Sequence, residues 1–501
     1  MNNELNKIIQ RICIEGYLKF PDSLHIGSGR SNIETDAVHF RDVAQNIMIP
    51  GTSIAGSIKN HVLRSKLFNE DVIYEIFGNN IKVSGETKKT KSSIYFEDIY
   101  PNDDIKDKTN ITAIRDGNAI RRDYGSTREG AKFDYEITPH GSIFLMKCMV
   151  DFRDRDDNLD EKKKIVRYCL EELLEGNIYI GGNKTRGLGR CYLYNDESLK
   201  IQIYTFPGEL GTFLLKTQKK SNTINEIYNS QVNSTNNDLV ISITSKIKNP
   251  LLIKDGMRSE VDKYIDYIDK NKHEHKKETD NYFVKIKEIG SEDEPVIPGG
   301  SLKGIFRNRA EKILRTLNES VCDPTDPNNS CSIKIKNMLN KNPRNIKKIG
   351  LERYKEIKKK SCSICRMFGN SYLASKIIFS DAKVNNFQTR KFDSVAINRF
   401  TAEPVVSALF TSMPAIKGEF KWNIKINKPE KEEIALMMFV LKDLINTFNP
   451  ISIGYGKTKG YGVVETDALS VMINGKCYTE YIDINKEIFA EWKNKRGKKN
   501  A

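Results

Sequence analysis

The sequence predicts an α+β protein of two tandem domains, each an antiparallel sheet of the split βαβ kind with helices on one face. Three observations support this prediction. The chain has 501 residues, more than one hydrophobic core usually organises. The phrase IPGTSIAGSIKN at 49–60 returns as IPGGSLKGIFRN at 297–308. Matching segments surround each phrase in the same order, so we interpret the halves as copies of one duplicated unit.

The first half begins with the run RICIEGYLKF, whose apolar residues alternate as in a half-buried strand. A loop containing Glu-Thr-Asp, with Asp36, leads to the Ile-Pro-Gly phrase and a helix-like run. The remaining elements are the turn EIFGN, the strand SSIYFED, a basic hairpin at 111–136, the amphipathic helix VRYCLEELLEG and the glycine-rich loop GGNKTRGLGR.

The second half repeats this order. A strand beginning LVISITSK precedes a second Glu-Thr-Asp, with Asp280, and the second Ile-Pro-Gly phrase. The turn RMFGN, the strand SKIIFSD, a hairpin at 395–410, the helix ALMMFVLKDLINTF and the loop GYGKTKGYG follow. A polar stretch between the halves, rich in Ser, Asn and Lys, is typical of a linker. The predicted units are a first domain at 1–218, a linker at 219–238, a second domain at 239–485 and a basic tail at 486–501.

The charge balance narrows the class of partner. There are 81 Lys and Arg residues against 66 Asp and Glu, a formal net charge of +15, which favours a polyanion such as nucleic acid. The sequence has no apolar run long enough to span a bilayer and no signal-like start, so we expect a cytoplasmic protein with no membrane partner. Nine cysteines are too few for a disulfide scaffold in a chain of this length and would remain thiols or metal ligands.

The ordered, doubled motif set resembles the repeat-associated (RAMP) superfamily of prokaryotic CRISPR proteins. The closest resemblance is to the backbone subunit of type III effector complexes, present twice in one chain as in the type III-D branch. The resemblance implies ferredoxin-like domains, similar to the RRM fold, with insertions and a thumb hairpin each. It also implies a subunit that binds the guide RNA (crRNA), meets target RNA and acts with other effector subunits in antiviral defence.

Asp36 and Asp280 occupy the position of the acidic loop residue with which catalytic family members cut target RNA. A lone carboxylate can hold a hydrated Mg²⁺ or Mn²⁺ ion, which helps the 2′-OH attack the adjoining phosphorus and leaves a 2′,3′-cyclic phosphate and a 5′-OH. A solvated loop aspartate is the simpler interpretation of each residue. Around Asp280, the loop also offers Asp262, Asp266 and Asp269. His25, His39, His273 and His275 lie nearby and are interpreted as ordinary polar loop residues.

Three groups of residues are predicted to contact RNA. Glycine lets a loop approach the RNA backbone closely, helix N-terminal amides attract phosphate, and arginine suits phosphate and base stacking. Tight turns and a solvated hairpin are the plain alternatives. The glycine-rich loops contribute Lys184, Arg186, Lys457 and Lys459; the helix starts contribute Ser53, Lys59, Ser301, Lys303 and Arg307; the first thumb contributes Arg115, Arg121, Arg122 and Arg128.

Four cysteines gather in one stretch of the second half. Cys362 and Cys365 have the two-residue spacing that places two thiolates on one Zn²⁺, and Cys322 with Cys331 can complete a tetrahedral site. The alternative is two buried thiols and two loop cysteines. A closed thiolate site leaves no open coordination position, so we expect structural zinc without a catalytic part.

Three functions therefore compete. The first is a guide-RNA-binding subunit that also cleaves target RNA, with a divalent metal, at one or both Asp loops. The second is the same scaffold without catalysis. The third is a guide-processing endoribonuclease of a related CRISPR family, which the repeated Ile-Pro-Gly phrase and the chain length disfavour.

Overall fold

The structure is a computed structural model that describes residues 7–33, 35–83, 86–122, 125–154, 156, 158–194, 199–217, 219–229, 237–255, 279–341, 351–445, 452–473 and 476–478. The predicted basic tail at 486–501, the linker residues 230–236, the acids Asp262, Asp266 and Asp269, and His273 and His275 lie outside these ranges. Within the ranges, no helix combines the length and apolar character needed to cross a membrane.

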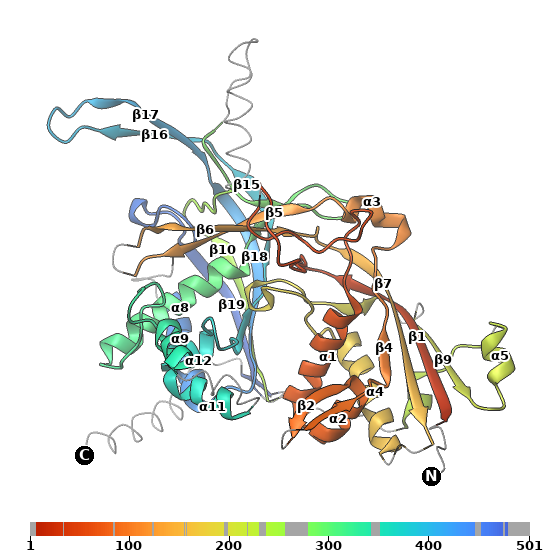
Figure 1. The fold of residues 1–501 in the computed structure, drawn as a ribbon. Coiled ribbons are helices and arrows are strands. Elements are labelled where there is room, and N and C mark those ends of the chain that lie inside the picture. Colours follow the sequence, from red (N-terminus) through yellow and green to blue (C-terminus); the bar gives the residue numbers. More distant parts are fainter. Residues whose placement is uncertain are drawn as a thin grey trace, which may run out of the picture.

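The first domain is a sheet with the strand order β4-β7-β1-β8, in which β9 also pairs with β1 (Figure 1). From Ile12 onward its central strand β1 buries every second residue, as the alternating sequence predicts. The helix α1 follows Pro50, and its apolar residues Ile54, Ile58 and Val62 recur at the spacing of one helix face and are buried. The bounds are β1 (Ile8–Phe20), α1 (Gly51–Ser65), β4 (Ile94–Phe96), β7 (Ser142–Arg153), α4 (Leu159–Leu174), β8 (Tyr192–Tyr194) and β9 (Lys200–Thr205).

The second domain repeats this arrangement, because β14 pairs with β18, β18 with β10, and β10 with β19. Helices α8 and α13 pack against each other and contribute to the core beneath the sheet. The bounds are β10 (Leu239–Ile247), α8 (Gly299–Thr316), β14 (Ile377–Phe379), β18 (Ala415–Ile426), α13 (Lys431–Ile445) and β19 (Val464–Ile473). Both halves combine helices with antiparallel sheets, so the predicted α+β class is confirmed.

A hydrogen bond at the start of each first helix shows how closely the halves correspond. The Asp98 carboxylate accepts from the Gly51 N–H at 2.8 Å, and the Asp381 carboxylate accepts from the Gly299 N–H at 2.7 Å. The two aspartates end the matching segments SSIYFED and SKIIFSD. The same side chain therefore holds the same helix terminus in both halves.

Two long hairpins lie at nearly the positions predicted for the thumbs. The first, β5 (Ala113–Ile120) and β6 (Thr127–Ile137), lies across the second domain, where Tyr135, Ile137 and Leu188 pack with Ile286 and Val296. The second, β16 (Phe392–Ile397) and β17 (Pro404–Met413), projects away from the body of the molecule (Figure 1). The two equivalent hairpins thus have different surroundings.

Shorter elements complete the described chain. Part of the predicted linker is ordered, because Ile227 of α6 is buried in the first core and its helix begins with a capping box at Thr223. In the first half these elements are α2 (Glu70–Phe77), β2 (Asn79–Val83), β3 (Glu86–Thr90), α3 (Lys106–Thr109), α5 (Leu210–Leu214) and α6 (Ile224–Ile227). In the second half they are β11 (Asn281–Tyr282), β12 (Lys285–Ile286), β13 (Glu294–Ile297), α9 (Cys331–Lys341), α11 (Leu351–Lys360), α12 (Ser363–Phe368), β15 (Ala382–Thr389) and β20 (Lys476–Tyr478).

Candidate catalytic loops and metal centre

Asp36 lies in an exposed loop that is held to the second strand of the first hairpin. Its N–H donates to the Asp134 carboxylate at 2.8 Å, and the Asp134 N–H donates to the Asp36 carboxylate at 3.1 Å. The next residue, Ala37, forms a parallel bridge with Tyr135. Two carboxylates are therefore fixed side by side at one point, and the sequence alone gave no signal for Asp134.

Asp280 is held in the same way in the second half. Its N–H donates to the Thr411 hydroxyl at 2.8 Å, and the Thr411 N–H donates to the Asp280 carboxylate at 2.7 Å. Asn281 pairs with Ser412 in parallel, as Ala37 does with Tyr135. The two loop aspartates thus occupy equivalent positions, with threonine in the second half where the first has Asp134.

A basic residue of the glycine-rich loop meets the same hairpin strand in both halves. The Arg186 guanidinium lies 5.5 Å from the ring centroid of Phe133, and the Lys459 ammonium lies 4.4 Å from that of Phe410. Phe133 and Phe410 directly precede Asp134 and Thr411 in the sequence. Each half therefore brings an acid, an aromatic ring and an exposed cation to one short stretch of strand, which suits a bound phosphodiester and a divalent ion.

The two histidines near the first loop, His25 and His39, are buried. Burial lowers the pKa of His39 to about 3 and also lowers the pKa of His25. Their rings pack edge to face, and Nδ1 of His25 lies 2.6 Å from the Glu136 carbonyl oxygen. Both side chains are buried, whereas the sequence led to their interpretation as ordinary polar loop residues.

The basic residues after the two Ile-Pro-Gly phrases have a structural partner. Lys59 donates to the carbonyl oxygen of Gly78 at 2.6 Å, and Arg307 donates to that of Gly369 at 3.0 Å. These glycines belong to the matching turns EIFGN and RMFGN. The matched pair of bonds accounts for the basic residue without RNA, while Ser53 and Ser301 remain partly exposed at their helix starts.

Lys184 and Lys303 belong to packed contacts rather than to open surface. Lys184 donates to the Ser57 hydroxyl at 2.9 Å, and Lys303 reaches across the domains to Thr185 at 2.8 Å. Burial lowers the pKa of Lys184 to about 8 and that of Lys303 to about 7, with the Arg186 and Arg307 charges lowering the latter further. Burial also lowers the pKa of Lys457.

Three of the four predicted thumb arginines contact the second domain. Arg115 and Asp381 form a pair at 2.6 Å with side chains only 4% and 1% exposed. Arg122 pairs with the buried Glu311 at 2.7 Å, and Arg128 donates to the Thr325 carbonyl oxygen. Arg121 is exposed. The structure therefore places Arg115, Arg122 and Arg128 in an interdomain contact, which the hairpin sequence by itself does not reveal.

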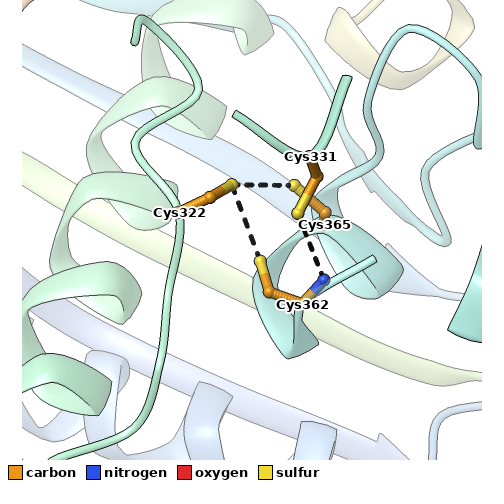
Figure 2. Close-up of side chains that lie close together, drawn as sticks. All are labelled: Cys322, Cys331, Cys362 and Cys365. Carbon is orange, nitrogen blue, oxygen red and sulfur yellow. Dashed lines mark hydrogen bonds between the residues drawn. The ribbon is translucent and has the colours of Figure 1, made fainter. Parts of the chain in front are cut away.

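Four of the five cysteines of the second half, Cys322, Cys331, Cys362 and Cys365, converge as predicted (Figure 2). Their sulfurs all lie within 4.8 Å of one another, with Cys322 at 3.5 Å from Cys365 and at 3.7 Å from Cys362. Tetrahedral zinc with Zn–S bonds of about 2.3 Å would place its sulfurs about 3.8 Å apart, so the cluster has the size of such a site. Arg307 donates to Cys365 Sγ at 3.4 Å, a contact that favours thiolate.

Comparisons with known proteins agree with the duplication. The family model described as RAMP superfamily matches residues 17–192 and 244–465. Among curated proteins, the chain is similar to one of Methanocaldococcus jannaschii named CRISPR system Cms endoribonuclease Csm3. The two are 26% identical over 201 residues, which cover 36% of this chain and 77% of that protein.

Proposed function

Because this chain belongs to the RAMP superfamily along both of its halves, we propose that it is a double backbone subunit of a type III CRISPR ribonucleoprotein. It binds the guide RNA and cleaves complementary target RNA at Asp36 and Asp280. The named activity of the M. jannaschii relative supports the endonuclease assignment. The strand orders β4-β7-β1-β8 and β14-β18-β10-β19 support a ferredoxin-like fold for the predicted domains at 1–218 and 239–485.

The observation that carries this proposal is the repeated clamp of a loop aspartate on a hairpin strand, whose preceding aromatic residue contacts a cation of the glycine-rich loop. Asp36 with Asp134, and Asp280 with Thr411, offer hard oxygen atoms that fit Mg²⁺ or Mn²⁺. A divalent ion held there would neutralise charge on the scissile phosphate as the 2′-OH attacks. The strand amides fix the orientation of each carboxylate, and Arg186 or Lys459 binds the neighbouring phosphate from its side of the strand.

The decisive experiment is cleavage of end-labelled target RNA by the guide-loaded assembly with Mg²⁺, resolved on a denaturing gel. Wild type, Asp36→Ala, Asp280→Ala and the double variant are compared, with guide binding measured in parallel. Two products that disappear one per substitution, with guide binding retained, support two nuclease sites. Cleavage that persists in the double variant would contradict the proposal.

A specific observation also favours the scaffold function without catalysis. The carboxylates of Asp36 and Asp280 each accept a backbone N–H from their hairpin, a structural role that would itself explain why both halves have an aspartate there. Asparagine keeps that acceptor oxygen but removes the charge. Asp36→Asn and Asp280→Asn therefore leave a scaffold unchanged and inactivate a nuclease, which separates the two functions on the same gel.

The proposed partners include further RAMP units on both sides of this chain. Asp381 of the second domain is covered by Arg115 and by the first glycine-rich loop, where a Cβ on Gly187 would lie 2.0 Å from its Oδ1. The equivalent Asp98 of the first domain is exposed, and the space around the equivalent Gly460 is open. The first domain thus exposes the equivalent of the Asp381 surface, and the second domain exposes the equivalent of the loop that covers Asp381.

The cysteine cluster is proposed to hold structural Zn²⁺. Four sulfurs at tetrahedral spacing fit that ion. A zinc ion with four thiolate ligands has no coordination position open for substrate. The ion would fix the loop between Cys322 and Cys331 to the start of α12, where Cys362 is the N-cap residue and Cys365 lies in the helix.

A further inference from the structure

A buried ionic network joins the cysteine cluster of the second domain to the hairpin of the first. Glu311 on α8 is fully buried, and its carboxylate oxygens receive Arg122 at 2.7 Å and Arg307 at 3.0 Å. Arg307 also donates to Sγ of Cys365 at 3.4 Å. A buried carboxylate is destabilised when it loses one of its paired cations. A displacement of Arg307 at the cluster would therefore change the pairing of Glu311 with Arg122.

A second connection reaches the hairpin from the other side of the cluster. Arg128 on β6 donates to the carbonyl oxygen of Thr325, which lies in the loop between Cys322 and Cys331. Arg315 donates to the carbonyl oxygen of Cys322 at 3.2 Å. Since both ends of this loop bear cluster cysteines, the position of the Thr325 acceptor depends on the cluster.

The hairpin carries these constraints to the first candidate catalytic loop. β5 and β6 are paired from Ala113 with Ile137 to Ile120 with Thr127, so the tip and base move together. Near the base, Asp134 exchanges its two hydrogen bonds with Asp36. A path of direct contacts therefore runs from the cysteines of one domain to the acid of the other.

The second hairpin supplies an internal reference. It holds Asp280 in the equivalent way but projects from the body (Figure 1), with Phe400 at its tip 99% exposed and Leu409 66% exposed. Its strands therefore do not share the first hairpin's support from the cluster. An effect that passes through that support should change the Asp36 site and leave the Asp280 site unchanged.

We propose that the metal-loaded cysteine cluster positions the Asp36 site of the opposite domain, through Arg122 and Arg128 as positioning residues on the first hairpin. The structural coupling can be tested on the purified chain without any RNA. Its consequence for cleavage rests on the proposed function and is measured separately, so that failure of one does not hide the other.

The first test is hydrogen exchange of the chain reconstituted with Zn²⁺ and of the same chain after chelation. Amides at 113–137 should exchange about tenfold faster or more without metal, the factor that the loss of a charge-assisted hydrogen bond corresponds to. Amides at 392–413 should be unchanged. Equal exchange at 113–137 in both samples, or a chain that binds no Zn²⁺, would overturn the proposal.

A second variant distinguishes the proposed coupling from general unfolding of the metal-free domain. Arg122→Ala with Arg128→Ala keeps every cysteine, so its zinc content should equal that of wild type while 113–137 loses protection. Arg122→Lys with Arg128→Lys retains a cationic donor at each position and should recover most of the protection. Arg353→Ala, on the neighbouring helix α11, is the matched control and should exchange like wild type. Unchanged protection in the double alanine variant would again overturn the coupling.

The third test measures both cuts in one lane of the target-RNA gel. A shift of a catalytic group by about 1 Å can lower a rate by about 100-fold, so the Asp36-dependent cut should fall by about 10- to 100-fold in the double alanine variant. The Asp280-dependent cut should keep its rate. Equal loss of both cuts would contradict site-specific positioning, whereas absence of cleavage in wild type would count against the proposed function and leave the exchange result to decide the coupling.

Discussion

At the residue scale, the two candidate sites differ in the hairpin residue that holds the loop aspartate. The first places two carboxylates, Asp36 and Asp134, on one clamp, and the second pairs Asp280 with the hydroxyl of Thr411. A second carboxylate adds negative charge next to any divalent ion without changing the backbone geometry. We therefore expect the two sites to require different Mg²⁺ concentrations although their backbone geometry is the same.

We expect Asp134→Thr to raise the Mg²⁺ concentration needed for the Asp36-dependent cut. The threonine hydroxyl can still accept the Asp36 N–H, as Thr411 does for Asp280, so the clamp is kept. Loss of one unit charge near the ion costs roughly 1–2 kcal/mol, or about 5- to 30-fold in half-saturating Mg²⁺. Thr411→Asp should lower the requirement of the other cut. A Mg²⁺ titration that shows no shift in either variant would contradict a metal role for this position.

A second residue-scale prediction concerns pH. Burial, with the charges of Arg186 and Arg307, lowers the pKa of Lys303 from 10.5 to about 7. The unfolded chain therefore binds one more proton than the folded chain between these values, and the free energy of unfolding rises with pH across that window. The Lys303→Met variant has no group that titrates there, so its free energy of unfolding lacks this rise. The rise amounts to about 1.4 kcal/mol for each pH unit of the window.

The expected result for Lys303→Met is a stability advantage over wild type at about pH 7 that shrinks toward about pH 9 to 10. Thermal unfolding across this series measures it. Lys336→Met, at an exposed position of α9, is the control and should follow wild type. A constant difference between Lys303→Met and wild type at all pH values would show that Lys303 is not held in its neutral form.

At the element scale, the structure explains which features the sequence could predict. Alternation in RICIEGYLKF and the matched phrases predict strands, helices and hairpins close to their observed bounds, and the match of the RAMP model to both halves confirms the family resemblance. The contacts of individual basic residues could not be predicted from the sequence. In the sequence Lys59 and Arg307 resemble phosphate ligands, but in the structure they donate to the turn carbonyls of Gly78 and Gly369. Arg115 is predicted to contact RNA, but it forms a buried ion pair with Asp381.

The cysteine cluster is the element whose role is easiest to measure. We expect one Zn²⁺ per purified chain by elemental analysis, and none in Cys362→Ser with Cys365→Ser. Because metal binding by such clusters contributes to folding free energy, that variant should also lose several kcal/mol of stability in the second domain. Cys13→Ser changes a half-buried thiol far from the cluster and should keep both zinc and stability. Zinc retained by the double serine variant would exclude these ligands.

At the scale of the whole molecule, the contact between the two domains is directional. The first domain contributes a hairpin and a glycine-rich loop, and the second contributes a helix start capped by Asp381. Such a contact is heterologous, so repeating it leaves one unmatched surface at each end of the chain. The exposed Asp98 belongs to one of these surfaces, and Lys459 and Gly460 belong to the other.

The charge of Asp98 should accordingly matter for assembly but not for the fold of the isolated chain. Asp98→Asn keeps an oxygen for the Gly51 N–H and removes the charge that would pair with a cation from the preceding unit. Loss of a charge-assisted bond of about 1.5–3 kcal/mol weakens association by about 10- to 100-fold. Mass photometry of the guide-loaded assembly over a dilution series measures this, with Asp103→Asn, an exposed acid nearby, as control. An assembly as stable as wild type would mean that the first domain's open end meets no basic partner, and that the repeated contact ends within this chain.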